Sequence, residues 1–297
     1  MGKLGADIDL KHLVIKDERG ACASLLGQAI ACLAKETRFA MRITTWNVNG
    51  LRAALRKGFA QQLELIRPDV LLLQEVRALP EQLPQEWAQP KGWHVHWNPA
   101  HKKGYAGTAI WTRQPSELLH TGLGKSDSDL EGRLICIRMG MLQVASVYLP
   151  SGSSSPERQI EKERWMRRFR HWATRQLSGD RLSVLGGDLN IAHTTKDIFY
   201  AQGNAQNSGF LPHERKWFGR LLDSGWHDLV RQYAGDIDGP YSWWSNRGRA
   251  RELDRGWRID YLLANTAARQ RFSKAITHRQ AGLLVSDHAP VTIEMDI

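Results

Sequence analysis

Short apolar runs alternate with helix-like segments from Met41 onward, and the runs have the length and composition of β-strands. The expected strands are Arg42–Trp46, Val70–Gln74, Gly107–Thr112, Leu134–Arg138, Gln143–Tyr148, Leu182–Gly186, Ile259–Leu263 and Val291–Met295. Met139-Gly140-Met141 separates two of these runs and indicates a hairpin, hence antiparallel pairing. Antiparallel neighbours mixed with separate helices predict an α/β (α+β) fold of packed sheets flanked by helices, rather than a doubly wound Rossmann sheet.

Three segments have helical periodicity: Leu51–Ile66, which Pro68 would end, Pro156–Leu177, and Pro212–Asp223, which Gly225 would close. In the second of these helices, apolar residues recur at helical spacing and are expected to face the core. They are Ile160, Met166, Phe169, Ala173 and Leu177.

Residues 1–40 differ from the rest of the chain. Ala21–Ala34 is small and apolar, but it is too short for a membrane span, and no clear cleavage pattern follows it. We expect residues 1–40 to be an N-terminal extension, partly disordered, that reflects an upstream start site, an added segment or a genuine appendage. Residues 41–297 would form one catalytic domain. The cysteines (Cys22, Cys32 and Cys136) have no zinc-ligand spacing and predict free thiols in a reducing compartment.

The charge balance favours a polyanionic partner. Lys and Arg number 41 against 31 Asp and Glu, which gives a net charge of +10. Nucleic acid fits this excess first and an anionic membrane surface second, although many basic proteins have no such partner. Five arginines between Arg164 and Arg175 indicate a solvated helix face. The cluster from Arg247 to Arg258 lies between Trp243-Trp244 and Trp257, and this mixture suits phosphate contact with stacking.

Polar residues follow the ends of many expected strands. They are Asn47, Asn49, Glu75, Tyr148, Asp188, Asn190, Asp260, Asp287 and His288. One such residue alone would be interpreted as a turn cap, but together they predict a shared site, because burying so many polar groups separately is costly. Oxygen ligands without cysteine suit a hard cation such as Mg²⁺. A metal, an Asp–Asn pair and an Asp-partnered histidine can hold a phosphodiester and activate water.

Several segments in this order match a known family: TWNVNGLRA (45–53), LLLQEV (71–76), GYAGTAIW (104–111), EGRLI (131–135), VYLPSG (147–152), GGDLNIAH (186–193), NSGFLPHER (207–215), GWRIDYLL (256–263) and SDHAPV (286–291). From Met41 to Ile297 the chain resembles the exonuclease III group of abasic-site (AP) endonucleases, within the endonuclease/exonuclease/phosphatase superfamily. The segments GFLPHER and GWRIDY point to its DNA-repair branch.

The resemblance implies a deoxyribonuclease-I-like, four-layered α/β sandwich with two mixed sheets packed face to face. It implies a Mg²⁺-dependent enzyme (Mn²⁺ as substitute) that cuts double-stranded DNA 5′ to an abasic site and leaves a 3′-hydroxyl. A 3′-phosphodiesterase or 3′→5′ exonuclease activity on blocked 3′ ends would accompany it, in base excision repair. We expect a monomer in the cytoplasm, associated with the nucleoid and not with a membrane.

Metal and water roles follow from the resemblance, residue by residue. Glu75 would bind Mg²⁺, with Asn47 and Asp287 as direct or water-mediated ligands. Asp188 would orient and deprotonate the attacking water, and Asn190 would position that water or the phosphate. Asp188 and Asn190 are also counted among the metal-site residues. The number of metal ions is left open.

Phosphate and DNA roles are implied in the same way. His288, held by Asp260, would bind a phosphate oxygen; Tyr148 would contact the phosphate or the leaving oxygen. Asp197 would support leaving-group protonation or a second metal position. The residues expected to contact DNA or to form the abasic-sugar pocket are Asn49, Lys102, Tyr105, Asn204, Asn207, Trp243, Trp257 and Ile259.

Two alternatives remain at this stage. One is a lipid or inositol-phosphate phosphatase on the same fold, and the other is a non-catalytic DNA-binding module. Ser151 stands where relatives often carry an amide, and the Arg247–Arg258 loop is distinctive. Because of these two features, the balance among abasic-site cleavage, 3′-end trimming and exonuclease action stays open.

Overall fold

Two six-stranded sheets form the centre of a compact unit over Met41–Asp296. The computed structural model describes residues 40–124, 127–179 and 181–297; the predictions for the N-terminal extension, with Cys22 and Cys32, lie outside them. Sheet A has the order β11-β12-β1-β2-β4-β3 and sheet B the order β5-β6-β7-β8-β10-β9. The strands of sheet A are β1 (Ala40–Asn47), β2 (Val70–Gln74), β3 (His94–Asn98), β4 (Thr108–Thr112), β11 (Phe272–Thr277) and β12 (Val291–Asp296). Those of sheet B are β5 (Glu117–Thr121), β6 (Leu134–Met139), β7 (Leu142–Tyr148), β8 (Leu182–Asp188), β9 (His227–Asp228) and β10 (Asp260–Ala264).

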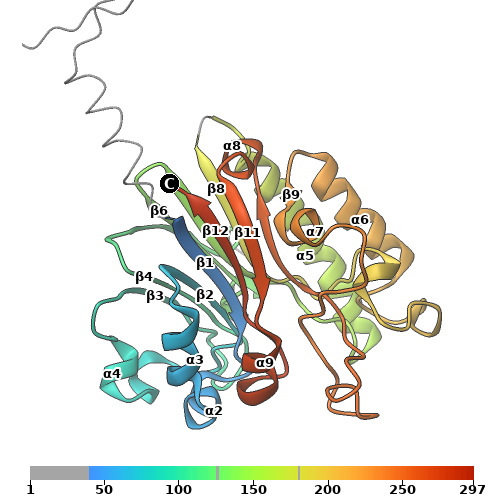
Figure 1. The fold of residues 1–297 in the computed structure, drawn as a ribbon, viewed down its shortest axis with the longest axis horizontal. Coiled ribbons are helices and arrows are strands. Elements are labelled where there is room, and N and C mark those ends of the chain that lie inside the picture. Colours follow the sequence, from blue (N-terminus) through green and yellow to red (C-terminus); the bar gives the residue numbers. More distant parts are fainter. Residues whose placement is uncertain (1–39, 125–126, 180) are drawn as a thin grey trace, which may run out of the picture. The chain divides into compact units, whose positions relative to one another are not determined.

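The sheets are mixed and pack face to face, with helices on their outer faces (Figure 1). Alternating side chains of each strand explain this arrangement. In β2, Val70 and Leu72 belong to the core between the sheets, whereas Leu71 and Leu73 face the helices beside sheet A. In β10, Leu262 faces the other sheet and Leu263 faces the helices beside sheet B. The predicted four-layered α/β sandwich is confirmed.

The helices cover both outer faces. They are α2 (Leu51–Arg56), α3 (Phe59–Ile66), α4 (Gln85–Ala88), α5 (Pro156–Arg175), α6 (Pro212–Asp223), α7 (Leu229–Ala234), α8 (Thr266–Arg269) and α9 (Arg279–Val285). The single helix predicted over Leu51–Ile66 is wrong: Gly58, with φ +97°, separates α2 from α3. This left-handed conformation is one that glycine adopts at little cost, and it ends the first helix.

Helix α5 begins as predicted, because the Ser155 side chain accepts a hydrogen bond from the Arg158 amide. Its buried side differs from the expectation. Trp165 and Trp172 are buried there, whereas Ile160 is 50% exposed and was wrongly expected in the core. The solvated face predicted from the arginines is present, with Arg164, Arg167 and Arg175 exposed. In the described part of the chain, no helix has the length and apolar character of a membrane span.

Strand register brings the polar strand ends together. Tyr148 at the end of β7 and Asp260 at the start of β10 both pair with Asp188 at the end of β8. In sheet A, Asn47 at the end of β1 pairs with Gln74, the residue before Glu75. The two sheets therefore present these groups at one edge of the sandwich.

Candidate active site

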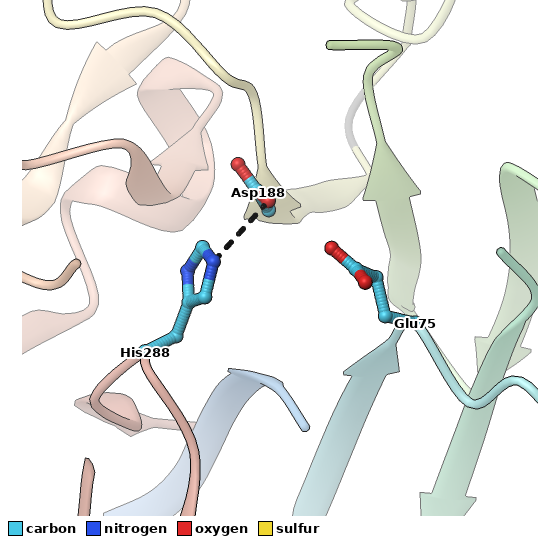
Figure 2. A group of neighbouring side chains, drawn as sticks. All are labelled: Glu75, Asp188 and His288. Carbon is cyan, nitrogen blue, oxygen red and sulfur yellow. Dashed lines mark ion pairs between the residues drawn. The ribbon is translucent and has the colours of Figure 1, made fainter. Parts of the chain in front are cut away.

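Two carboxylates and an imidazole converge at this edge. Glu75, Asp188 and His288 each offer one potential ligand atom, and these atoms all lie within 4.8 Å of one another. Figure 2 shows the three side chains pointing toward a common centre. Glu75 is 8% and Asp188 1% exposed, and Glu75 has a left-handed φ of +51°. A glutamate in this conformation is uncommon, and such strain typically marks functional sites.

An amide links the carboxylates from the two sheets. The Asn47 Nδ2 group donates to Glu75 Oε1 at 2.8 Å and to Asp188 Oδ2 at 2.9 Å. Its Oδ1 accepts from the Asn49 amide at 3.0 Å, so this oxygen faces away from the carboxylates. The Tyr148 hydroxyl also donates to Glu75 Oε1, at 2.8 Å. Asn47 therefore holds the two carboxylates together through its side-chain nitrogen, and its role as a direct or water-mediated Mg²⁺ ligand stays a prediction.

The histidine is oriented by a buried aspartate. The Nδ1 atom of His288 lies 2.9 Å from Asp260 Oδ2, and its Nε2 lies 3.8 Å from Asp188 Oδ2. Ser242 Oγ donates to the same Asp260 oxygen at 2.7 Å. Because Asp260 accepts the proton on Nδ1, Nε2 is the ring nitrogen that faces the carboxylates and the cavity.

Burial and charge shift the pKa values of these groups. Burial raises the pKa of Asp188 above that of an ordinary carboxyl, and the nearby Asp260 and Glu75 charges add to this effect. Burial alone would lower the pKa of His288, but the negative charges of Asp260 and Asp188 raise it. Burial, followed by the charge of Glu75, raises the pKa of Tyr148. A carboxyl with a raised pKa beside a charged imidazole is suited to proton transfer at neutral pH.

A cavity of about 850 Å³ opens onto this cluster. Among the predicted site residues, those that line it are Asn49, Glu75, Tyr148, Asp188, Asn190, Asn207, Trp243, Trp257, Ile259, Asp287 and His288. Asp287 accepts hydrogen bonds from Asn49 Nδ2 at 2.8 Å and Trp243 Nε1 at 3.2 Å. The rings of Trp243 and Trp257 stand edge to face, 5.9 Å apart. With Ile259 they form an apolar wall beside the polar cluster.

Four predicted residues lie elsewhere. Asp197 is fully buried and pairs with Arg258 and Arg231, so it does not reach the cavity as the resemblance implied. Lys102 and Tyr105 line a neighbouring hollow that shares Ser154 with the cavity, and their contact with DNA stays a prediction. Asn204 does not line the cavity, but it accepts a hydrogen bond at 2.8 Å from Asn207, which does.

The arginine cluster expected to contact DNA is divided. Arg247 is exposed and lines the cavity. Arg258, in contrast, is 1% exposed and pairs with Asp197 and Asp228, so the expectation is wrong for this residue. Arg251 donates to backbone carbonyls at the end of α9, including that of Ser286 at 3.1 Å. It thereby ties down the loop that carries Asp287 and His288.

Sequence reasoning missed several site residues. Arg77 pairs with Glu75 and lines the cavity, and only its position two residues after the glutamate hints at this. Ser242 precedes the predicted Trp243 and gives no signal of its own. A serine-rich wall that includes Ser153 and Ser155 also borders the cavity. These serines lie in the loop between β7 and α5, and no strand or helix pattern in the sequence places that loop beside the site.

The donor set fits a hard divalent cation. Carboxylate oxygens are the ligands that Mg²⁺ prefers, and Glu75 and Asp188 supply them from two different sheets. Two buried carboxylates this close repel each other, and a cation between them offsets that repulsion. His288 has a raised pKa, and a charged imidazole is a hydrogen-bond donor and not a metal ligand.

Comparisons with known proteins agree with this geometry. A model of the Endonuclease/Exonuclease/phosphatase family matches residues 44–288. The exodeoxyribonuclease of Bacillus subtilis (strain 168) is 36% identical over 258 residues, 86% of this chain and 100% of that protein. The DNA-(apurinic or apyrimidinic site) endonuclease of Dictyostelium discoideum is 30% identical over 259 residues, 86% of this chain and 71% of that protein.

A solved structure of a Neisseria 3′ phosphatase, bound to a product DNA hairpin, has a TM-score of 0.79 and 32% identity. The match covers 87% of this chain and 100% of that one. The chain thus belongs to the Endonuclease/Exonuclease/phosphatase family and is an enzyme of its exonuclease III-like group of AP endonucleases and exodeoxyribonucleases.

Proposed function

We propose that this protein is a Mg²⁺-dependent DNA repair phosphodiesterase that cuts the backbone 5′ to an abasic site and leaves a 3′-hydroxyl. Activity on blocked 3′ ends or as a 3′→5′ exonuclease would use the same site. The observation that carries the proposal is the convergence of Glu75, Asp188 and His288 within 4.8 Å at the floor of a cavity. Catalysis would reside in residues 41–297.

Glu75 and Asp188 would hold the cation, which when bound would draw charge from the phosphate and lower the pKa of water. Asp188 would orient the attacking water and accept its proton. The Asn190 amide donates to Asp188 Oδ1 at 2.9 Å and would keep that carboxylate aligned.

His288 would donate from Nε2 to a phosphate oxygen, because Asp260 occupies Nδ1 and keeps the ring charged. The Tyr148 hydroxyl, whose raised pKa keeps its proton, would donate to the phosphate or the leaving oxygen when DNA displaces it from Glu75. Both groups would stabilise negative charge that develops in the transition state.

The apolar wall would select the lesion. Trp243, Trp257 and Ile259 would pack around a deoxyribose that lacks its base, whereas a base would need room beyond this wall. Turning a baseless sugar out of the helix also costs less than turning out a paired nucleotide. The chain's net charge of +10 supports duplex DNA as the substrate. We propose a monomer that acts on chromosomal DNA in the cytoplasm.

A matched panel of duplexes tests the proposal. Intact, internal abasic, 3′-phosphate and 3′-recessed duplexes would each be incubated with Mg²⁺, with Mn²⁺ or with EDTA. We expect incision on the 5′ side of the abasic site with either metal and none with EDTA. Asp188→Asn is the matched inactive control. Metal-independent cleavage, or release of phosphate from inositol phosphates without DNA cleavage, would refute the proposal.

A further inference from the structure

A buried ion pair lies behind the active-site cavity. Lys162 Nζ on α5 is 2.6 Å from Glu214 Oε1 on α6, and neither side chain is exposed to solvent. Burial lowers the pKa of Lys162, and the charge of Glu214 opposes that effect. Neither residue lines the cavity, and the mechanism proposed above does not use them.

Lys162 contacts the catalytic turn. Its Nζ donates to the Asn190 backbone carbonyl at 2.9 Å. Asn190 has a left-handed φ of +48° and binds Asp188 through its backbone amide, while its side chain donates to the Leu149 carbonyl at 2.9 Å. The ammonium group therefore fixes the residue that aligns the proposed base.

Glu214 contacts a second segment that borders the cavity. Its Oε2 accepts from the Gly209 amide at 2.7 Å and from the Leu211 amide at 3.1 Å. Gly209 lines the cavity, and a Cβ built there would lie 3.1 Å from the Asn190 carbonyl oxygen. The segments that carry Asn190 and Gly209 thus lie against each other at the position that the ion pair spans.

Stability alone does not explain a charged pair at this position. Well-packed apolar residues of similar volume commonly replace a buried ion pair without loss of stability, whereas removal of one partner is strongly destabilising. An apolar pair would leave two backbone groups on different segments without hydrogen-bond partners. They are the Asn190 carbonyl, which accepts from Lys162, and the Gly209 amide, which donates to Glu214.

We propose that Lys162 and Glu214 are positioning residues of the active site. Their ion pair sets the distance between the turn that carries Asp188 and Asn190 and the wall that carries Gly209. The inference rests on the proposed function for its kinetic readout. It concerns turnover and not DNA affinity, because phosphate contacts made elsewhere supply most of that affinity.

The test uses the double variant Lys162→Met/Glu214→Leu, which removes both charges. Its Tm should fall by about 5–20 °C, because the Asn190 carbonyl and the Gly209 amide lose their buried partners, and the assay is run below that Tm. Its kcat on an abasic duplex in Mg²⁺ should fall about 10- to 100-fold, as for loss of other groups that orient catalytic residues, with KM changed less than about 3-fold. The matched control is Arg42→Met/Glu294→Leu, an ion pair outside the cavity, with kcat unchanged.

A wild-type kcat in the folded double variant would overturn the inference, whatever its Tm. If that variant does not fold, Glu214→Gln, which keeps the side-chain volume, is assayed at a temperature below its Tm. Its kcat should be about 10-fold lower than that of the wild type. An unchanged kcat would overturn the inference. Failure of the proposed function can be told apart from failure of this inference, since the wild type would then incise no abasic duplex.

In that case hydrogen exchange of the Asn190 backbone amide tests the positioning role. Faster exchange in the double variant supports the inference, and unchanged protection contradicts it.

Discussion

Replacement of Asp197 by asparagine separates a structural role from a catalytic one. Arg258 Nε lies 2.7 Å from Asp197 Oδ1, and its Nη2 lies 2.8 Å from Asp228 Oδ2. Breaking a buried ion pair costs about 3–5 kcal/mol, and because Asp228 still pairs with Arg258 we expect about 3 kcal/mol for Asp197→Asn. At about 2–4 °C per kcal/mol, Tm should fall by about 6–12 °C.

The loss should depend on pH. Burial opposes ionisation of Asp197, but Arg258 and Arg231 hold its pKa well below that of an ordinary carboxyl. Because the pKa of Asp197 is lower in the folded state, its ionisation stabilises the fold. This contribution to the free energy of unfolding is complete above the unfolded-state pKa of about 3.9 and is lost progressively as the pH falls below that value. Urea unfolding should therefore show the full difference between wild type and Asp197→Asn at pH 7, and a shrinking difference below about pH 4.

Activity completes this prediction. Because Asp197 does not line the cavity, kcat of Asp197→Asn on an abasic duplex should stay within about 3-fold of the wild type well below its Tm. Asp236→Asn, at an exposed carboxylate near the same loop, is the control and should change neither stability nor rate. A kcat loss of about 100-fold in a fully folded Asp197→Asn protein would refute the structural assignment.

Three further predictions concern the cavity and its surroundings. Gly209 has a φ of +95°, and a Cβ there would lie 3.0 Å from the Trp257 ring, so Gly209→Ala should lower kcat/KM on abasic duplexes about 10-fold. The control is Gly248→Ala, whose Cβ would meet open space and which should leave kcat/KM unchanged. Arg251→Met removes the donor that holds the loop before the catalytic histidine, so kcat should fall about 10-fold in steady-state assays, and an unchanged kcat would contradict this role. Arg247→Ala should lower the slope of log affinity against log salt by about one in anisotropy titrations; an unchanged slope would exclude a phosphate contact.

The core strands and the polar residues at their ends could be predicted from the sequence because both signals are local. Strands such as Val70–Gln74 are continuous apolar runs, and the residue that follows each strand is fixed at the sheet edge. Edge strands gave no such signal: β3 and β5 are partly exposed and of mixed polarity, as His94–Asn98 illustrates.

Tertiary contacts explain what the sequence did not reveal. Arg258 has the composition expected of a DNA-contacting arginine, but two distant aspartates from other segments surround it and bury it. The same applies to Asp197, for which the family resemblance implied a role in leaving-group protonation or a second metal position, and which instead pairs with Arg258 and Arg231. The Asn47 amide points its nitrogen at both carboxylates because the Asn49 amide occupies its oxygen, a detail of backbone turning that no motif encodes.

The most direct test of the central claim is the initial rate at which Glu75→Gln incises an abasic duplex at saturating Mg²⁺. Glutamine keeps the shape of the side chain and an acceptor for Tyr148, but it removes the charge that would hold the cation. We expect incision to fall about 10²–10³-fold while the fold and DNA binding in EDTA persist, with Glu81→Gln as an unaffected exposed control. Incision at a near-normal rate by Glu75→Gln would contradict the assignment of this edge of the sandwich as a metal-dependent phosphodiesterase site.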